Sequence, residues 1–197
     1  MELTMMEELD NFYGLVRKAE YPREWEKNAE PISLCEFTAE TGQVMAKFLE
    51  VARLKPFMAI ARSIQLIWGV DEMGKLYVSI EEVARINGVQ VKPGHPIRRG
   101  VDPKISLDQK LGHPCVLPES GGRIAGMIYI DDATVDGGLA WTLNAESGRF
   151  HGTIDRWPTN KQVKNVAQIF ATGVGSNVSL DFKDDMRSAL TELSVSP

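Results

Sequence analysis

Two of the three histidines in the chain stand in the same tripeptide. His95 and His113 each lie between a glycine and a proline, in the order Gly-His-Pro. Proline fixes its own φ angle and restricts the residue before it, so the backbone holds each imidazole in a defined direction. Such a side chain can bind a ligand or transfer a proton near neutral pH. The alternative is that each histidine serves only the geometry of a turn.

The third histidine follows a polar turn. Arg149 and His151 are two residues apart on an expected strand, so their side chains point to the same face of a sheet. Trp141 on the paired strand would add a flat apolar wall, and such a cluster suits an anionic or nucleotide-like ligand. We take His113 and His151 as candidate acid–base residues, and the candidate ligand-binding residues are Arg149, Trp141, Asn144, Ser147 and His95.

A purely structural interpretation of the polar turn stays open. Asn144 and Ser147 can stabilise it by hydrogen bonds from their side chains to the backbone. Gly148 can adopt the left-handed conformation that such turns use. None of this requires a ligand.

Cysteine and carboxylate chemistry has weaker support. Cys115 lies two residues after His113, but a catalytic cysteine usually meets its histidine across the fold. Asp131, Asp132 and Asp136 could bind a divalent cation, but they complete no Asp-x-Asp-x-Asp-Gly loop. The chain has two cysteines and so cannot form a four-cysteine zinc site. We predict no metal site and assign no cofactor.

The composition is typical of a folded, acidic protein. The 197 residues carry a net charge of −5, and 43% are hydrophobic while 25% are charged. These fractions argue against a disordered, collagen-like or coiled-coil chain. Neutralising phosphates requires a basic face, so general nucleic-acid binding is not expected.

The sequence predicts neither a signal peptide nor a membrane span. Residues 1–10 carry acidic side chains where a signal peptide has positive charge before an apolar run. The longest uncharged stretch, residues 165–180, is interrupted by glycine and polar residues and falls short of about 18 consecutive apolar residues. Two cysteines require no disulfide framework. We expect a cytoplasmic protein, or one secreted without a signal peptide.

The N-terminal part of the chain predicts two helices. One covers residues 4–19 and, with an irregular connection, makes residues 1–31 a helical appendage. From Thr38 onward, apolar residues recur at steps of three and four, which places them on one face of a second helix.

The next segments predict a hairpin. Residues 57–70 are so apolar that we expect the whole run to be buried, with strand spacing towards its end. Residues 75–80 alternate in polarity after a glycine-containing loop, which predicts the returning strand. Residues 81–86 predict a short helix. Prolines and glycines then predict a long ordered loop over residues 92–121.

The C-terminal third predicts a three-stranded antiparallel meander. Residues 122–130 are apolar on both alternating faces, which indicates a central strand, and residues 139–143 and 149–154 follow as further strands. Thr159 is a good N-cap for the next helix. Residues 178–182 predict one more strand, and the chain would close with a helix near residues 186–193. We therefore predict a single α+β domain over residues 1–197, with an antiparallel sheet packed by several helices.

One part of this region resembles a known pattern. Residues 121–126 and 137–150 are similar to the strand, hairpin and Ser-Gly-His-Tyr turn of plant IQ-motif proteins and of assorted bacterial effector-like proteins. This chain has Arg149 and Phe150 where that pattern has His and Tyr, lacks the Arg-Pro that follows, and contains no IQ helix. The resemblance implies a shared strand scaffold, without calmodulin binding.

Two functions are compatible with these features. The first is a soluble interaction or effector-type module with a protein partner, whose working surface is formed by residues 92–121 and 122–154. The alternative is a small transferase or hydrolase that acts on an anionic or nucleotide-like substrate. It would use His113 or His151 as the general acid or base, and Arg149 to bind the anionic group of the substrate. An enzyme requires these side chains to converge on one pocket.

Overall fold

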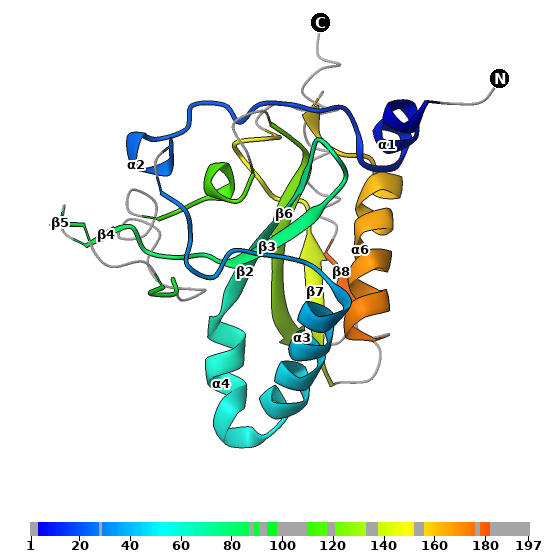
Figure 1. The fold of residues 1–197 in the computed structure, drawn as a ribbon. Coiled ribbons are helices and arrows are strands. Elements are labelled where there is room, and N and C mark those ends of the chain that lie inside the picture. Colours follow the sequence, from blue (N-terminus) through cyan, green and yellow to red (C-terminus); the bar gives the residue numbers. More distant parts are fainter. Residues whose placement is uncertain are drawn as a thin grey trace, which may run out of the picture.

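A six-stranded sheet lies at the centre of the computed structural model, in the order β1-β3-β2-β6-β7-β8 (Figure 1). The structure describes residues 4–27, 29–86, 89–90, 94–97, 110–117, 121–132, 138–151, 156–175 and 178–181. The strands of the sheet are β1 (Cys35–Glu36), β2 (Gln65–Asp71), β3 (Leu76–Ile80), β6 (Gly122–Asp132), β7 (Leu139–Asn144) and β8 (Val178–Leu180). All neighbours are antiparallel except β7 and β8, which are parallel. The α+β class is confirmed.

The expected hairpin and central strand are both present. β2 pairs with β3 around a turn in which the Asp71 carboxylate accepts hydrogen bonds from the backbone of Met73 and Lys75. Gly74 has a φ of 83°, which favours glycine at this position. β6 lies between β2 and β7, and its residues are buried on both faces, as its apolar pattern predicts.

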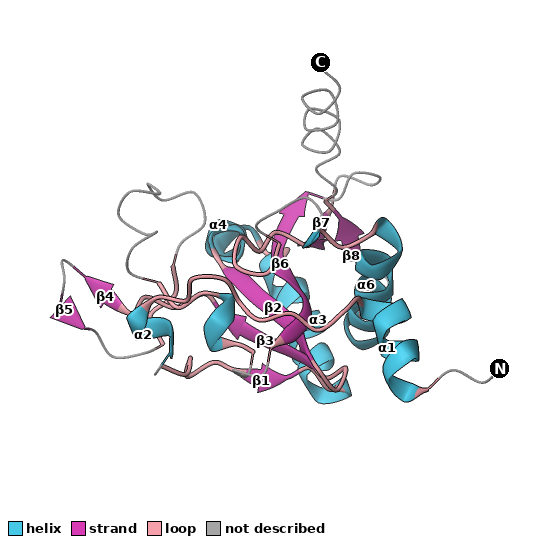
Figure 2. Cartoon of the chain, turned by 90° about the horizontal axis from the view of Figure 1, so that it is seen from above, coloured by secondary structure: helices cyan, strands magenta, loops and turns pink. Residues whose placement is uncertain are grey.

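Two helices cover one face of the sheet (Figure 2). They are α3 (Ala39–Ala52) and α6 (Asn160–Val174), and each begins after a threonine N-cap, Thr38 and Thr159, the latter expected from the sequence. The main core lies between them and the sheet, and includes Trp68, Trp141 and Phe170. The further elements are α1 (Met5–Tyr13), α2 (Glu24–Lys27), α4 (Lys55–Ser63), the 3-10 helix η1 (His113–Cys115), and the small pair β4 (Arg85–Ile86) and β5 (Val89–Gln90). None of the helices in the described segments is long and apolar enough to cross a membrane.

The other face of the sheet is covered by the N-terminal connection and by η1. Arg17 forms a two-way backbone bridge with Gly122 at the start of β6. Beneath this connection, Leu117, Ala125 and Phe150 form a separate apolar cluster. The residues that the sequence selects as functional lie mainly on this side of the molecule.

Three predictions about the N-terminal half are wrong in their extent or type. The first helix ends at Tyr13 because Gly14 takes a φ of 101° and closes it. Residues 55–63 form a helix, since Pro56 fits its first turn, and part of its apolar surface is exposed. Residues 81–86 are not helical, because the buried Glu82 carboxylate accepts hydrogen bonds from the backbone of Ser33 and Gly94 and holds this segment extended.

The predicted meander is present only in part. β6 and β7 form its first two strands, but the second neighbour of β7 is β8. Residues 148–150 turn instead of extending, because the Ser147 carbonyl oxygen accepts hydrogen bonds from the backbone of Phe150 and His151. The remainder of the predicted third strand, the predicted helix near residues 186–193 and most of the 92–121 loop lie outside the described residues.

Candidate functional site

Two of the selected residues lie apart from the others. Trp141 is in the main core, where its Nε1 donates a hydrogen bond to the Met45 carbonyl oxygen at 3.3 Å. It therefore does not form the expected wall of a ligand site. His95 is exposed in the short segment 94–97, where its carbonyl oxygen accepts a hydrogen bond from the Val83 backbone.

Asn144 stabilises the turn after β7 through its side chain, and Ser147 does so through its backbone carbonyl oxygen. The Asn144 Oδ1 accepts hydrogen bonds from the backbone nitrogens of Met127 at 3.2 Å and Glu146 at 3.1 Å. The Ser147 hydroxyl is buried and has no hydrogen-bond partner among the described residues. The contacts of Asn144 correspond to the structural interpretation of the turn, whereas the Ser147 hydroxyl forms no such hydrogen bond with the described residues.

The two candidate acid–base histidines contact adjacent residues of β6. The His113 Nε2 donates a hydrogen bond to the Gly126 carbonyl oxygen at 2.8 Å. The His151 ring lies between two carbonyl oxygens, with Nδ1 3.1 Å from that of Arg156 and Nε2 3.1 Å from that of Ala125. β6 pairs with β7 from Met127 to Asp132. The carbonyl oxygens of Ala125 and Gly126 lie just before this paired stretch, and the two imidazoles contact them there.

Both histidines are neutral at neutral pH. Burial lowers the pKa of His113 to about 4, although the hydrogen bond to Gly126 opposes this shift. Burial also lowers the pKa of His151 to about 4, and the positive charges of Arg17 and Arg156 contribute in the same direction. The proton of His113 must sit on Nε2, because a carbonyl oxygen can only accept. Its Nδ1 therefore carries the lone pair.

His113 and Arg149 both line a cleft of about 580 Å³, whereas His151 does not line it. We call it the His113 cleft. Its charged lining consists of Glu20, Glu26, Glu81, Glu146, Arg23, Lys110 and Arg149. Lys110 Nζ lies 2.5 Å from Glu81, and Arg149 Nη2 lies 3.4 Å from Glu26. Because these cations are paired and carboxylates outnumber cations, the cleft is a poor site for an anion.

Arg149 is also occupied by the N-terminal connection. Its Nη1 donates hydrogen bonds to the carbonyl oxygens of Glu20 and Tyr21. In return, the Arg149 carbonyl oxygen accepts a hydrogen bond from the Glu20 backbone at 2.7 Å. The Arg149 guanidinium group therefore binds residues 20–26 to the turn at residues 148–150. Its hydrogen bonds and its ion pair are made with the protein itself.

His151 lines a different hollow, which we call the arginine pocket. It measures about 260 Å³, and its charged lining consists of Arg17, Arg123, Arg156 and Asp10. Tyr13 and Gly14, where α1 ends, also line it, as do Thr159 and Gln162 at the beginning of α6. The pocket therefore gathers three guanidinium groups against one lining carboxylate. None of these arginines was selected from the sequence.

Distant segments position the three arginines. The backbone bridge to Gly122 fixes Arg17, and the Arg123 side chain is fully enclosed, with Nη1 2.5 Å from Asp10 Oδ1 and 2.9 Å from the Gly14 carbonyl oxygen. Arg156 pairs with Glu20. The sequence contains one sign of this pocket. Arg123 interrupts the apolar run of residues 122–130, and an arginine in a buried strand requires a partner for its charge. Its companions could not be identified without the fold.

The described residues contain no activated nucleophile. Burial raises the pKa of the Cys115 thiol to about 12, so the thiol stays protonated, and its Sγ lies 3.3 Å from the Glu26 carbonyl oxygen. In the described part of the chain, no hydroxyl or thiol group donates a hydrogen bond to His113 or His151. The same residues contain no metal-binding group of three or more acidic, histidine or cysteine side chains.

Comparison with known proteins adds no family assignment. The chain matches no protein-family model, no curated protein and no solved structure.

Proposed function

We propose that the protein is a binding module for a small anionic ligand, whose anionic group occupies the arginine pocket. The observation that carries this proposal is the convergence of Arg17, Arg123 and Arg156 on one hollow with a single lining carboxylate. Guanidinium groups bind phosphate and carboxylate oxygens through paired, charge-assisted hydrogen bonds.

Several features of the pocket strengthen its positive potential. The Arg123 side chain is fully enclosed, and its guanidinium group is held by the Asp10 carboxylate and the carbonyl oxygens of Gly14 and Glu72, so it acts on the pocket through its charge, which water screens little. The first turn of α6, a helix of 15 residues, lies at the pocket rim and adds the positive end of its dipole. Asp10 pairs with Arg123 and Glu20 pairs with Arg156, so an anion in the pocket would share these guanidinium groups with the two carboxylates.

The size of the pocket limits the ligand. Pockets that enclose drug-sized molecules typically measure about 300–1,000 Å³. A hollow of about 260 Å³ suits a phosphate, sulfate or carboxylate group, with the remainder of a larger ligand outside. This proposal retains the ligand class expected from the sequence, but moves its anion site from Arg149 to the three arginines around His151.

Titration calorimetry with inorganic phosphate, sulfate and nucleoside monophosphates tests the proposal directly. We expect the wild-type protein to bind at least one of these anions. Arg17→Gln removes one lining charge and should weaken binding by about 1.5–3 kcal/mol, the scale of a hydrogen bond to a charged group. Lys18→Gln is the matched control, because it removes a neighbouring exposed charge that does not line the pocket.

Two results would contradict the proposal. The first is the absence of any heat or thermal stabilisation with every anion tested on the wild-type protein. The second is an anion response of equal strength in wild type, Arg17→Gln and Lys18→Gln, which would indicate a diffuse charge effect. Thermal denaturation of each variant without ligand shows whether Arg17→Gln remains folded.

A further inference from the structure

The connection between α3 and α4 carries large apolar side chains on its surface. Val51, Leu54, Phe57 and Ile60 are 44%, 56%, 46% and 58% exposed. We call residues 51–60 the α3–α4 tip. Contiguous exposed apolar surface on a folded protein usually marks an interaction site. The sequence predicts burial of residues 57–70, whereas Phe57 and Ile60 of that run are exposed.

The local backbone places these side chains at successive turns. The backbone nitrogen of Leu54 donates to the Val51 carbonyl oxygen at 3.0 Å, and that of Phe57 donates to Leu54 at 2.9 Å. Phe57 and Ile60 are three residues apart within α4, so their side chains are neighbours on the helix surface, and Leu54 is the residue that caps this helix. Ala52 and Ala61 are buried instead and anchor the tip to the main core.

Positively charged residues flank the apolar residues along the sequence. Lys47, Arg53 and Lys55 are exposed, whereas Glu50 is the one carboxylate between residues 41 and 62. Arg62, at the end of α4, pairs with Asp132. The tip is therefore locally basic in a chain whose net charge is −5. This charge distribution is complementary to an anionic surface.

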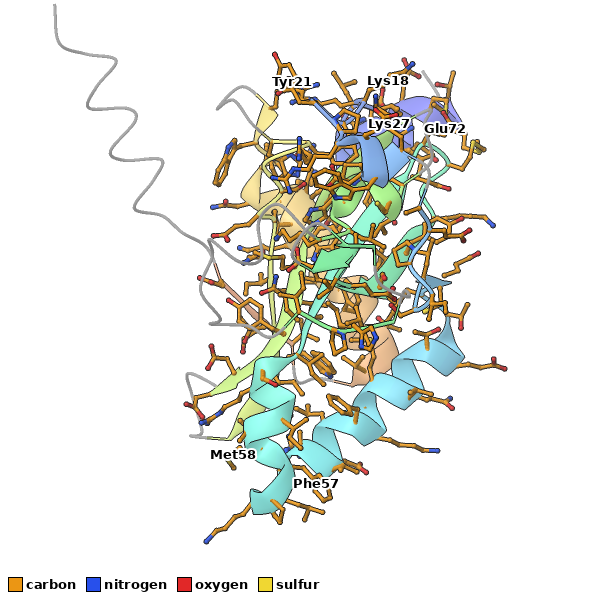
Figure 3. The ribbon with its side chains drawn as sticks, turned by 90° about the vertical axis from the view of Figure 1, so that its left-hand side faces the viewer. Lys18, Tyr21, Lys27, Phe57, Met58 and Glu72 are labelled. Atoms are coloured by element: carbon orange, nitrogen blue, oxygen red, sulfur yellow. The ribbon has the colours of Figure 1, made fainter. Side chains whose placement is uncertain are left out.

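The tip projects from one end of the molecule. In Figure 1, α3 and α4 extend beyond the sheet and converge at their connection. Figure 3 shows Phe57 and Met58 at the opposite end from Lys18, Tyr21, Lys27 and Glu72. The arginine pocket lies near that other end, since Arg17 bridges the start of β6 while Arg62 of α4 pairs with its last residue, Asp132.

We propose that the α3–α4 tip docks onto an anionic lipid surface. A projecting apolar tip can enter the interface of a bilayer without a complementary groove, while Lys47 and Lys55 contact anionic headgroups. A folded protein partner would instead have to offer an apolar concavity lined with carboxylates. Docking of this kind is peripheral and needs no membrane-spanning helix. It is independent of the arginine pocket, so either proposal can fail without the other.

Vesicle sedimentation of the full chain tests this docking. The probes are phosphatidylcholine vesicles with and without phosphatidylserine. We expect binding only when phosphatidylserine is present, and we expect it to decrease as the salt concentration rises, because salt screens surface charge. Saturating the arginine pocket with inorganic phosphate should leave vesicle binding unchanged.

Substitutions assign the binding to the tip. Phe57→Glu and Ile60→Glu should each weaken partitioning by at least about tenfold, since each removes an inserted apolar side chain and adds a repelled charge. Lys55→Gln should weaken it by about fivefold. Met73→Glu is the matched control, because Met73 is 54% exposed but lies in the β2–β3 turn outside the tip. It should bind as the wild type does.

Three results would overturn the proposal. They are no sedimentation with any vesicle, equal sedimentation with neutral vesicles, and full binding by both Phe57→Glu and Ile60→Glu. Sedimentation velocity separates one specific alternative: a dimer that Phe57→Glu dissociates, without vesicle binding by the wild type, would identify the tip as a contact between two copies of the chain. Circular dichroism of each variant shows whether the fold is retained.

Discussion

Arg149 shows how one residue selected for ligand binding can serve the fold instead. Its guanidinium group contacts the carbonyl oxygens of Glu20 and Tyr21, and it also pairs with the Glu26 carboxylate, of which only 3% of the side chain is exposed. A single side chain thus satisfies a buried charge and two backbone groups. Spacing along the sequence reveals which side chains share a face, but not which groups already occupy them.

Replacing Arg149 by Ala should therefore destabilise the protein by about 2 kcal/mol, because the buried Glu26 carboxylate loses its cationic partner and keeps the hydrogen bond from the Arg23 backbone nitrogen. Urea denaturation at pH 7 measures this loss. Lys27→Ala is the control, since Lys27 forms only an exposed pair with Glu24 and should change the stability by less than about 0.5 kcal/mol. Unchanged stability together with lost anion binding would return Arg149 to the ligand site.

At the scale of elements, the packing of α3 against α6 depends on two facing glycines. A Cβ atom built on Gly42 would lie 2.6 Å from the Gly173 backbone, and one built on Gly173 would lie 2.7 Å from the Phe37 ring. Backbone atoms cannot move aside as a flexible side chain can. The close approach of the two helices therefore requires glycine at position 42.

Gly42→Ala should destabilise the protein although alanine is the better helix former. The steric cost of overpacking is about 1–3 kcal/mol, against a gain in helix propensity of about 1 kcal/mol. Chemical denaturation should show a net loss for Gly42→Ala and almost no change for Gln43→Ala, at the exposed neighbouring position. A gain in stability for Gly42→Ala would mean that the helices lie farther apart than the structure indicates.

At the scale of the molecule, patterns in the sequence predicted individual helices and strands better than they predicted exposed faces and pockets. The alternation of apolar residues identified β6, and Thr159 identified the beginning of α6, because both signals are local. The apolarity of residues 57–63 predicted burial but could not show which side faces solvent. The arginine pocket was missed because Arg17, Arg123 and Arg156 come from three separate segments, which only the fold brings together.

The whole molecule should also lose stability in mild acid because of its two buried histidines. The pKa values of His113 and His151 are lowered from 6.5 to about 4 on folding, mainly by burial. The folded state therefore binds fewer protons than the unfolded state between these values, and the free energy of unfolding decreases as the pH falls. The stabilisation is complete above pH 6.5, and each histidine can contribute about 3 kcal/mol to its loss by pH 4.

Urea denaturation at several pH values between 7 and 4 measures this dependence. His113→Gln and His151→Gln replace each imidazole by a neutral amide that can still donate a hydrogen bond, so the double variant should show a flatter dependence than the wild type. The wild type with saturating phosphate is a second comparison. A bound anion next to His151 favours its charged form, so it should raise the pKa of His151 and reduce the loss of stability in acid. Identical slopes for wild type and double variant would show that neither imidazole is held neutral by the fold, and the loss in acid would then have to come from the carboxylates.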